Sequence, residues 1–388
     1  MKQINRNVIM LGWVSFFTDL ASAMIMPILP IFVVLILDEG MDKLGIIVAI
    51  STFASYALRL LSGYISDRYG IVKPLVVGGY TFSALSKPLI GLTDGYKSVA
   101  GLQVAERLGK GLRSAPKDVM IAEYSRENAS GKTFGFHKMM DIAGELCGAL
   151  ILFVILLYFG QSETVMRNIF YATLVPGIIG LVIVIFFVRD VPRTKHIAEQ
   201  SFALADKDKK SIGALFFYFF FLLFSFSSSF FTMQAKEIGI ATAIIPLLFV
   251  VSSGVQTLSS YFFGILIDKF GVKRILAFSY ACGTVAQGLL YLQSPLFTWL
   301  AYLFLGLFTV ASLNANRVYI AQNAYNKGSV YGIFYAGVAL FGAVGAYIGG
   351  LIWEHFDMHS ALVYSFTGTL ILTLLFFFAK GRSSKSLS

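Results

Sequence analysis

Long runs of apolar residues, separated by short polar turns, recur from one end of the chain to the other. Each run holds about 20 residues or more, the length that an α-helix needs to cross the hydrocarbon core of a bilayer. Segments such as Ile151–Phe159 and Phe216–Phe224 do not alternate in polarity, as the strands of a transmembrane barrel would. We predict an all-α membrane protein with twelve spans, at residues 8–37, 43–65, 74–93, 98–122, 132–160, 168–188, 212–234, 240–267, 272–293, 296–320, 328–353 and 359–379.

The composition supports a polytopic membrane protein. Of the 388 residues, 57% are hydrophobic and only 13% are charged, whereas soluble domains carry roughly 25% charged residues. This composition excludes a soluble enzyme, a coiled coil and a disordered chain. Cys147 and Cys282 both lie in apolar runs, so there is no disulfide framework and no paired-cysteine metal motif. The first run is too long for a signal-peptide core, and we interpret it as an uncleaved first span.

One connection, residues 189–210, is long and polar, and it separates six predicted spans from six others. It is rich in Lys and Arg, so the positive-inside rule predicts that it is cytoplasmic and that both termini lie on the same side. Four basic residues then fall outside: Lys43, Lys97, Arg167 and Lys236. The net charge of +10 is explained by this orientation and not by binding to nucleic acid. We therefore expect a multi-pass protein of a bacterial inner (plasma) membrane.

The two halves of the chain repeat one another. The turn at Gly63–Lys73 reads GYISDRYGIVK, and GILIDKFGVKR follows at Gly264–Arg274. A second pair is GKTFGF at Gly131–Phe136 and GSVYGI at Gly328–Ile333. We predict two six-helix bundles related by a pseudo-two-fold axis, at residues 1–188 and 211–380, joined by the linker 189–210 and followed by a tail at 381–388.

These duplicated turns, together with Arg107-Leu-Gly-Lys-Gly111 in the fourth span, resemble motifs of the major facilitator superfamily. Nearly the whole chain resembles a branch of its bacterial permeases that are often described as drug or uncharacterised solute transporters. The resemblance implies transport by alternating access. It departs from many exporters at Gly144–Ala149, where the two glycines are present but the following proline is absent.

The duplicated turns are expected to form a conformational latch that stabilises one access state. Asp67 would accept bonds from the exposed N–H groups at the start of a neighbouring helix, and Arg68 and Lys73 would pair across the interface between the halves. The complete predicted latch is Arg59, Gly63, Asp67, Arg68, Gly70, Lys73, Gly264, Asp268, Gly271 and Lys273.

Ionisable residues inside the spans are costly in hydrocarbon and should face the bundle interior or water. Apart from histidine they are Asp19, Arg59, Lys87, Glu106, Arg107, Lys110, Arg113, Lys138, Asp141, Glu145 and Arg317, and all but the last lie in the amino-terminal half. Asp19 and Arg107 both fall near the midplane, and the resemblance places their spans beside one cavity. We therefore expect these two residues to form an ion pair.

The fourth span carries Arg107, Lys110 and Arg113 within an arc of roughly 120° at about 100° per residue. Three basic groups on one face could bind an anionic substrate, with Arg suited to carboxylate or phosphate. Alternatively, they pair with Asp19, Asp141 and Glu145.

The fifth span carries His137, Asp141 and Glu145 at i, i+4 and i+8, on one helix face. We expect Asp19, Asp141 and Glu145 to be the proton-coupling residues, whereas His137 is expected at the cytoplasmic rim. These side chains supply too few ligands for a metal site, and no metal or other cofactor is predicted. In the carboxy-terminal half, Asn314 and Arg317 are candidate substrate contacts. The serines at 225–229 are expected to hydrogen bond between helices.

We predict a secondary active transporter, coupled to protons, for a small organic solute that is anionic. The alternatives are a proton-driven multidrug efflux antiporter and an uptake permease for a carboxylate siderophore or a metabolite. The sequence holds no P-loop for ATP and no catalytic histidine constellation, so an enzyme is not expected. The expected partners are the solute, protons and the lipid bilayer, with no nucleic acid, and the expected oligomeric state is a monomer.

Overall fold

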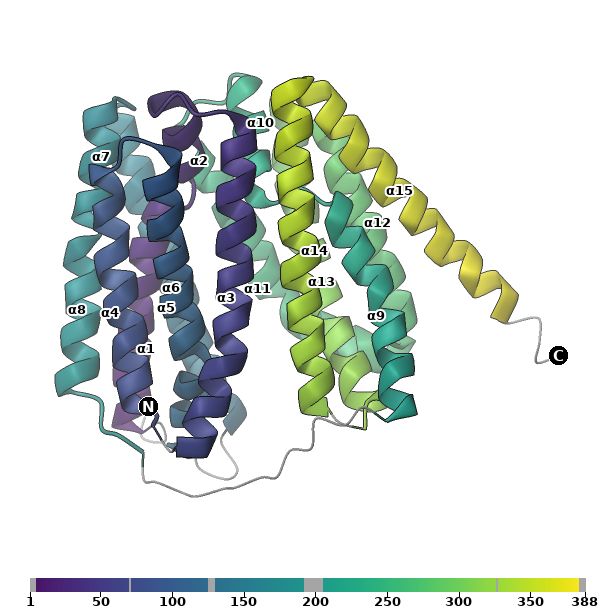
Figure 1. Ribbon diagram of the computed structural model, residues 1–388, viewed down its shortest axis with the longest axis horizontal. Coiled ribbons are helices and arrows are strands. Elements are labelled where there is room, and N and C mark those ends of the chain that lie inside the picture. Colours follow the sequence, from purple (N-terminus) through teal and green to yellow (C-terminus); the bar gives the residue numbers. More distant parts are fainter. Residues whose placement is uncertain (1–4, 70, 125–129, 192–204, 326, 384–388) are drawn as a thin grey trace. The chain divides into compact units, whose positions relative to one another are not determined.

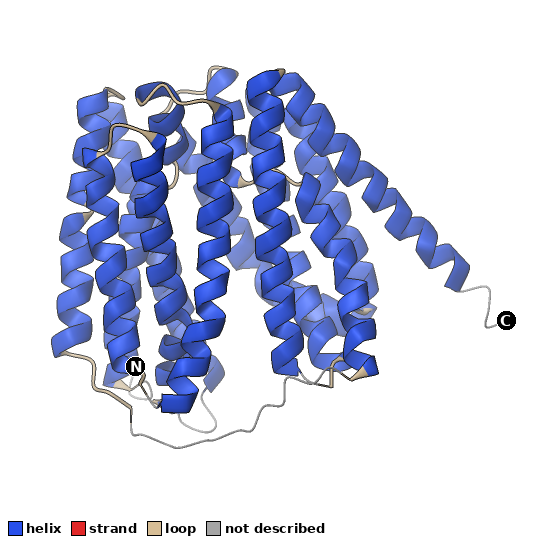
Figure 2. Ribbon diagram, in the orientation of Figure 1, coloured by secondary structure: helices blue, strands red, loops and turns tan. Residues whose placement is uncertain are grey.

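The computed structural model describes residues 5–69, 71–124, 130–191, 205–325 and 327–383. Within these ranges every regular element is a helix, and none is a strand (Figure 2). The chain divides into two compact units. Unit 1 is Met1–Glu39, Ile50–Gln200 and Thr242–Leu247, and unit 2 is Gly40–Ala49, Ser201–Ala241 and Leu248–Ser388.

The helices of unit 1, labelled in Figure 1, come mainly from the first half of the chain. They are α1 (Arg6–Ile25), α2 (Leu29–Ile31), the π-helical turn Phe32–Ile36, most of α3 (Met41–Tyr69), α4 (Lys73–Leu89), the 3-10 turn Ile90–Leu92, α5 (Tyr96–Glu123), α6 (Ser130–Phe159), α7 (Glu163–Ala172) and α8 (Leu174–Phe186).

The helices of unit 2 come mainly from the second half (Figure 1). They are α9 (Asp206–Phe224), α10 (Ser228–Glu237), most of α11 (Ile245–Phe270), α12 (Val272–Tyr291), α13 (Pro295–Asn323), α14 (Lys327–His355) and α15 (Met358–Ser383).

Within the described part of the chain, eight stretches are long and apolar enough to cross a membrane, so the protein is a multi-pass membrane protein. These stretches are Arg6–Ile36, Lys73–Leu92, Phe136–Phe159, Glu163–Phe186, Asp206–Glu237, Pro295–Ile320, Val330–His355 and Met358–Phe378. The remaining predicted spans coincide with α3, α5, α11 and α12. The count of twelve therefore stays a prediction.

Several of the predicted spans contain a break in the α-helix, among them the first and the seventh. In the first, α1 ends at Ile25 before Pro27, because proline lacks an N–H group and its ring obstructs the preceding turn. In the seventh, α9 ends at Phe224 and α10 begins at Ser228. Ser365 of α15 donates a hydrogen bond of 2.6 Å to the Phe224 carbonyl, which satisfies a backbone group that the interruption leaves without a helical partner.

The same pattern of helix contacts occurs within each unit. In unit 1, α1 packs against α6 and α8, and α4 packs against α5 and α8. In unit 2, α9 packs against α14 and α15, and α12 packs against α13 and α15. The repeated motifs at Gly131–Phe136 and Gly328–Ile333 lie at the starts of α6 and α14, which hold equivalent places in the two sets of contacts.

Glycines determine how closely the helices of unit 1 approach. A Cβ added at Gly144 or Gly148 of α6 would collide with the carbonyl oxygen of Phe16 or Leu20 on α1. On the α4–α5 contact, a Cβ at Gly109 would lie 2.7 Å from the Gly79 carbonyl oxygen. Small residues permit such close packing in membranes, so the two glycines of the fifth span retain a packing role without the proline.

The first turns of α3 belong to unit 2 because they pack against the end of α14. The Met41 N–H donates a hydrogen bond of 2.6 Å to the Glu354 carboxylate, which satisfies a free donor at the start of α3. One turn further, a Cβ added at Gly45 would lie 2.7 Å from the Ala346 carbonyl oxygen.

Candidate functional site

The three basic residues predicted on one face of α5 lie in three different environments. Arg107 is partly exposed, and its Nε lies 3.5 Å from Oε2 of Glu106. Arg113 is buried: it donates a hydrogen bond of 3.0 Å to Ser83 and stacks over the Tyr80 ring at 4.6 Å. Among the described residues, none forms a hydrogen bond or an ion pair with the Lys110 ammonium. Arg107 and Lys110 therefore retain donors for a ligand, whereas the donors of Arg113 are engaged within the protein.

A buried ion pair joins α4 to α5 beside these residues. The Lys87 ammonium lies 3.9 Å from Oε1 of Glu106, and it donates a hydrogen bond of 3.3 Å to the Thr18 carbonyl on α1. Ser83 donates a hydrogen bond of 3.2 Å to the same Glu106 oxygen. The carboxylate is thus shared between a lysine, an arginine and a hydroxyl group, as a buried charge requires.

The expected ion pair between Asp19 and Arg107 is not present among the described residues. Arg107 contacts Glu106, which precedes it on its own helix, and Asp19 interacts electrostatically with Lys87, Lys110 and Lys117. Lys87 lies on α4, whereas Lys110 and Lys117 lie on α5, the helix that also carries Arg107. Which cation faces Asp19 therefore depends on the position of each residue along and around its helix.

The face of α6 that carries His137, Asp141 and Glu145 is turned toward the other helices of unit 1. His137 is only 5% exposed and follows Phe136, where the apolar stretch of α6 begins, so its expected place at the cytoplasmic rim stays a prediction. Its Nδ1 lies 3.5 Å from Oδ1 of Asp141, a buried oxygen with no hydrogen-bond partner in the described chain. Glu145 is partly buried and interacts electrostatically with Asp19 and Lys110. Proton carriers are expected in such places, where charge compensation is incomplete.

Three residues that were not predicted connect α1, α4, α5 and α6. The Ser15 hydroxyl of α1 lies 3.0 Å from Nε2 of His137 and 3.3 Å from the Tyr80 hydroxyl. Lys117 of α5 donates a hydrogen bond of 3.1 Å to the same hydroxyl. Lys117 could have been found from the sequence, because it follows Lys110 and Arg113 at i+7 and i+4 on one helix face. Nothing in the local sequence distinguishes Ser15 or Tyr80.

The candidate contacts in unit 2 are less concentrated. Asn314 of α13 donates a hydrogen bond of 3.3 Å to the Ser260 carbonyl of α11, a contact between helices. Arg317 is exposed, and its Nε donates a hydrogen bond of 3.2 Å to the Tyr335 hydroxyl. Of these two, Arg317 is better placed to meet a solute.

Only part of the predicted latch lies within the described residues. Arg59 donates a hydrogen bond of 3.4 Å to Ser114, and the Lys73 ammonium donates one of 2.8 Å to the Ile185 carbonyl at the end of α8. Lys273 is exposed, and Gly271 has a φ of +82°. Gly70, the surroundings of Gly63 and the side chains of Asp67, Arg68 and Asp268 fall outside the described set.

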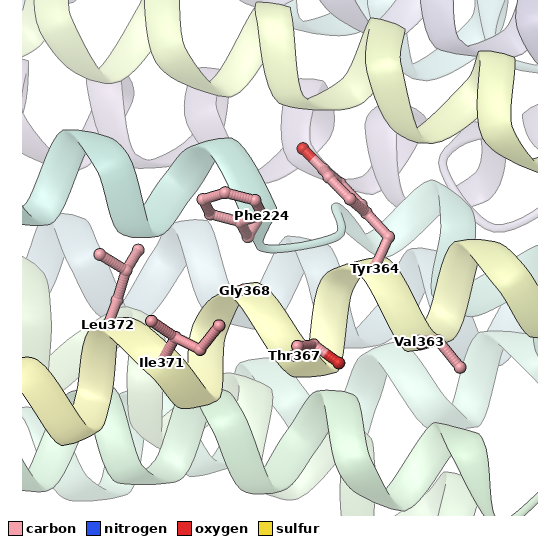
Figure 3. Close-up of a pocket in the computed structure, with 7 residues that line it drawn as sticks. All are labelled: Phe224, Val363, Tyr364, Thr367, Gly368, Ile371 and Leu372. Atoms are coloured by element: carbon pink, nitrogen blue, oxygen red, sulfur yellow. The ribbon is translucent and has the colours of Figure 1, made fainter.

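A groove of about 460 Å³ lies in unit 2, where the end of α9 meets α15 (Figure 3). Its lining contains no charged side chain and differs in this respect from the polar cluster of unit 1. The lining residues are Phe224, Val363, Tyr364, Thr367, Gly368, Ile371 and Leu372.

A family model described as the Major Facilitator Superfamily matches residues 11–235 and again residues 212–388. The chain belongs to this superfamily. An uncharacterized MFS-type transporter of Methanocaldococcus jannaschii is 29% identical over 368 residues, covering 91% of this chain and 90% of that protein. The multidrug resistance protein MdtH of Proteus mirabilis is 28% identical over 140 residues, covering 34% of this chain and 35% of that protein.

The fold is also that of solved transporters. The crystal structure of the nucleoside transporter NupG superposes with a TM-score of 0.77 at 15% identity, covering 96% of this chain and 98% of that one. This likeness shows the shared fold, whereas the family match and the MFS-type relative indicate a membrane transporter of the superfamily.

Proposed function

We propose that this transporter is coupled to protons and carries a small organic anion, with Arg107 and Lys110 as the anion contacts in unit 1. The observation that supports this proposal is the environment of Lys110. Its ammonium has no hydrogen-bond or ion-pair partner among the described residues, although a charge within a membrane protein is ordinarily paired. A carboxylate or phosphate group of the solute would accept hydrogen bonds from both side chains and balance their charge.

Asp19, Asp141 and Glu145 are the proton carriers of this proposal. They lie on α1 and α6 and interact electrostatically with Lys110 or Lys117 of α5. Taking up a proton on one of these carboxylates removes a negative charge that competes with the solute for the same cations. Proton and solute occupancy are therefore linked through charge.

The experiment is transport by the purified protein in liposomes under an imposed pH gradient, with pools of anionic and of cationic solutes. We expect an anionic pool to move with protons. Lys110→Gln should raise KM about tenfold, which corresponds to about 1.4 kcal/mol of lost solute binding. Lys138→Gln is the matched control, because Lys138 is 64% exposed on α6. Unchanged affinity in Lys110→Gln would contradict the anion site.

Asp19→Asn tests the proton role separately. We expect this variant to exchange solute across the membrane without a gradient but to lose accumulation driven by a pH gradient. If accumulation in Asp19→Asn equals that of the wild type, Asp19 is not a proton carrier.

The second candidate is a proton-driven multidrug efflux antiporter. The partial similarity to MdtH favours it, and the absence of proline after Gly148 counts against it. Proton movement with lipophilic cations, and not with anions, would support this alternative.

We further propose that the linker 189–210 and both termini lie in the cytoplasm of a bacterial cell, because basic residues concentrate there. The signature turns would form the latch on that side. Labelling of single cysteines from each side of the membrane tests the orientation.

A further inference from the structure

Ser15 lies at the point where the proposed proton carriers meet the cations of α5. Its hydroxyl is buried and contacts three side chains from three other helices: His137 at 3.0 Å, Lys117 at 3.1 Å and Tyr80 at 3.3 Å. A serine hydroxyl has one proton to donate and two lone pairs to accept with. Three contacts therefore use its full capacity, and the direction of each hydrogen bond depends on the other two.

The direction at Lys117 is fixed, because an ammonium group only donates. One proton and one lone pair of Ser15 remain for His137 and Tyr80. Either Ser15 donates to Nε2 of His137 and accepts from Tyr80, or Nε2 donates to Ser15 and Ser15 donates to Tyr80.

Asp141 decides between these two arrangements. Its Oδ1 is buried, lies 3.5 Å from Nδ1 of His137 and has no hydrogen-bond partner in the described chain. When the Asp141 carboxylate is ionised and His137 is neutral, the ring must direct an N–H at this oxygen, since two lone pairs would repel each other. The single ring proton is then on Nδ1, and Nε2 accepts from Ser15.

We propose that Ser15 is the positioning residue that transmits proton occupancy of the His137–Asp141 pair to Lys117 and Tyr80. A second proton, supplied by water through the coupling pathway, forms an N–H bond at Nε2 and converts the ring to an imidazolium. Nε2 then donates to Ser15, and the Ser15 hydroxyl reverses and donates to Tyr80. This inference rests on the proposed proton coupling and adds two residues to it: His137, which takes up the proton, and Ser15, which is not itself a proton carrier.

The reversal of the Ser15 hydroxyl changes the environment of Lys117 and of Arg113, the two cations of α5 that are in contact with Ser15 and with the Tyr80 ring respectively. Lys117 and the new imidazolium both donate to one hydroxyl, so two positive charges face each other across Ser15. Tyr80 receives a hydrogen bond in place of donating one, and its ring is the surface on which Arg113 stacks. Protonation on α6 thereby weakens the hydrogen bond between Lys117 and Ser15 and makes the Lys117 ammonium available to the solute or to Asp19.

The charged and titratable groups around His137 come from every helix packed on it. Asp141 and Lys138 lie on α6, Asp19 on α1, Tyr80 on α4 and Lys117 on α5. Lys138 is largely exposed, and its Nζ is 4.0 Å from Oδ2 of Asp141. Lys117 is the cation held against the hydroxyl that His137 contacts, so the ring and this lysine share Ser15 as a common partner.

The first test is the tautomer of His137, which does not depend on transport. His196, His355 and His359 are replaced by Gln in the full chain, and the remaining histidine is labelled with ¹⁵N and observed by NMR in liposomes. We expect the Nδ1–H tautomer at alkaline pH and the imidazolium at acidic pH. An Nε2–H tautomer at alkaline pH would overturn the inference.

The second test is the coupling between proton and solute. Ser15→Ala should keep solute exchange without a gradient but lower accumulation driven by a pH gradient about tenfold, the effect of one lost hydrogen bond to a charged group. Ser15→Thr, which keeps the hydroxyl, should restore accumulation. Ser22→Ala is the matched control, since Ser22 on the same helix only donates to the Thr18 carbonyl.

The two tests separate failure of this inference from failure of the proposed function. If Ser15→Ala accumulates solute under a pH gradient as well as the wild type does, the role of Ser15 is overturned and proton coupling is unaffected. If the wild type moves no protons, the proposed coupling fails. In that case the ¹⁵N signal of His137 in Ser15→Ala still tests whether the Ser15 hydroxyl responds to the charge on His137. If the ring signal is the same in Ser15→Ala as in the wild type, the role of Ser15 is contradicted.

Discussion

Lys87 and Glu106 form an ion pair in the interior of unit 1, with the ammonium 3.9 Å from the carboxylate and side chains only 5% and 8% exposed. Removing Glu106 leaves the buried Lys87 ammonium without this carboxylate, and removing Lys87 leaves Glu106 with its contacts to Arg107 and Ser83. Breaking a buried ion pair typically costs about 3–5 kcal/mol. The pair also joins three helices, because Lys87 contacts Thr18 on α1. Because Glu106 also contacts Arg107, the same carboxylate stabilises unit 1 and lies next to a proposed anion contact.

We expect Lys87→Met and Glu106→Gln each to lower the free energy of unfolding by about 3 kcal/mol or more. The double variant should lose less than the sum of the two, because neither charge is then left alone. Unfolding by denaturant in detergent micelles measures this. The exposed pair of Lys209 and Asp206 is the control, and its removal should change stability by about 0–1 kcal/mol. Additive losses at Lys87 and Glu106 would contradict the coupling.

Arg113 should matter for stability and not for solute affinity. Its guanidinium is bonded to Ser83 and stacked on Tyr80, and a lysine cannot reproduce both contacts. We expect Arg113→Lys to lower the free energy of unfolding by about 1–3 kcal/mol, with KM close to that of the wild type. Parallel measurements of unfolding and transport check this. A large rise in KM with unchanged stability would assign Arg113 to the solute.

Gly144→Ala should destabilise unit 1 by about 1–3 kcal/mol, because its methyl group would collide with the Phe16 carbonyl and push α6 from α1. Gly342→Ala on α14 is the control, since nothing lies within 4 Å of a Cβ added there. That change should stabilise the helix by about 0.5–1 kcal/mol. Thermal unfolding of both variants in the same detergent distinguishes packing from helix propensity.

The second signature turn contains two glycines with different requirements. Gly271 has a φ of +82° and closes α11 through a hydrogen bond of 2.8 Å to the Ile267 carbonyl. Gly264 lies within α11, and nothing is within 4 Å of a Cβ added there. We expect Gly271→Ala to cost about 1–2 kcal/mol, the strain of a left-handed residue with a Cβ, and Gly264→Ala to be neutral or stabilising. Equal effects in thermal unfolding would refute this assignment.

Asp357 precedes α15 and accepts a hydrogen bond of 2.6 Å from the Ser360 N–H. This bond lowers the pKa of the carboxyl group below its usual value of 3.8. Because the pKa is lower in the folded state, the stabilisation is present above the pKa of the unfolded chain. It is lost as the pH falls through the folded pKa. We expect Asp357→Ala to weaken the start of α15 at pH 7, and by less at a pH below the folded pKa, where only the charge-dependent part of the cap is lost; Asp357→Asn should keep most of the cap at both pH values. Helix protection measured by hydrogen exchange at both pH values tests this.

Much of the fold follows from the sequence, because long apolar runs in a bilayer can satisfy their backbone groups only as helices. The duplicated turns and Arg107–Gly111 were sufficient to indicate the superfamily. The interruption after Ile25 is also local, since Pro27 causes it. The interruption at 225–227 contains no proline, and its freed carbonyl is satisfied by Ser365 from a helix 141 residues away.

The sequence by itself determined that the protein is helical and crosses a membrane. It also determined that the ionisable residues of the predicted spans lie mainly in the amino-terminal half, since hydropathy and helical periodicity are properties of the local chain. Periodicity states which side chains share a helix face, but not which neighbouring helix that face meets. Helix packing decided that Asp19 lies near Lys87, Lys110 and Lys117 without an ion pair to Arg107, and that His137 is buried. It also brought Ser15, Tyr80 and Lys117 together from three helices, because each hydrogen bond depends on positions that only the tertiary structure supplies.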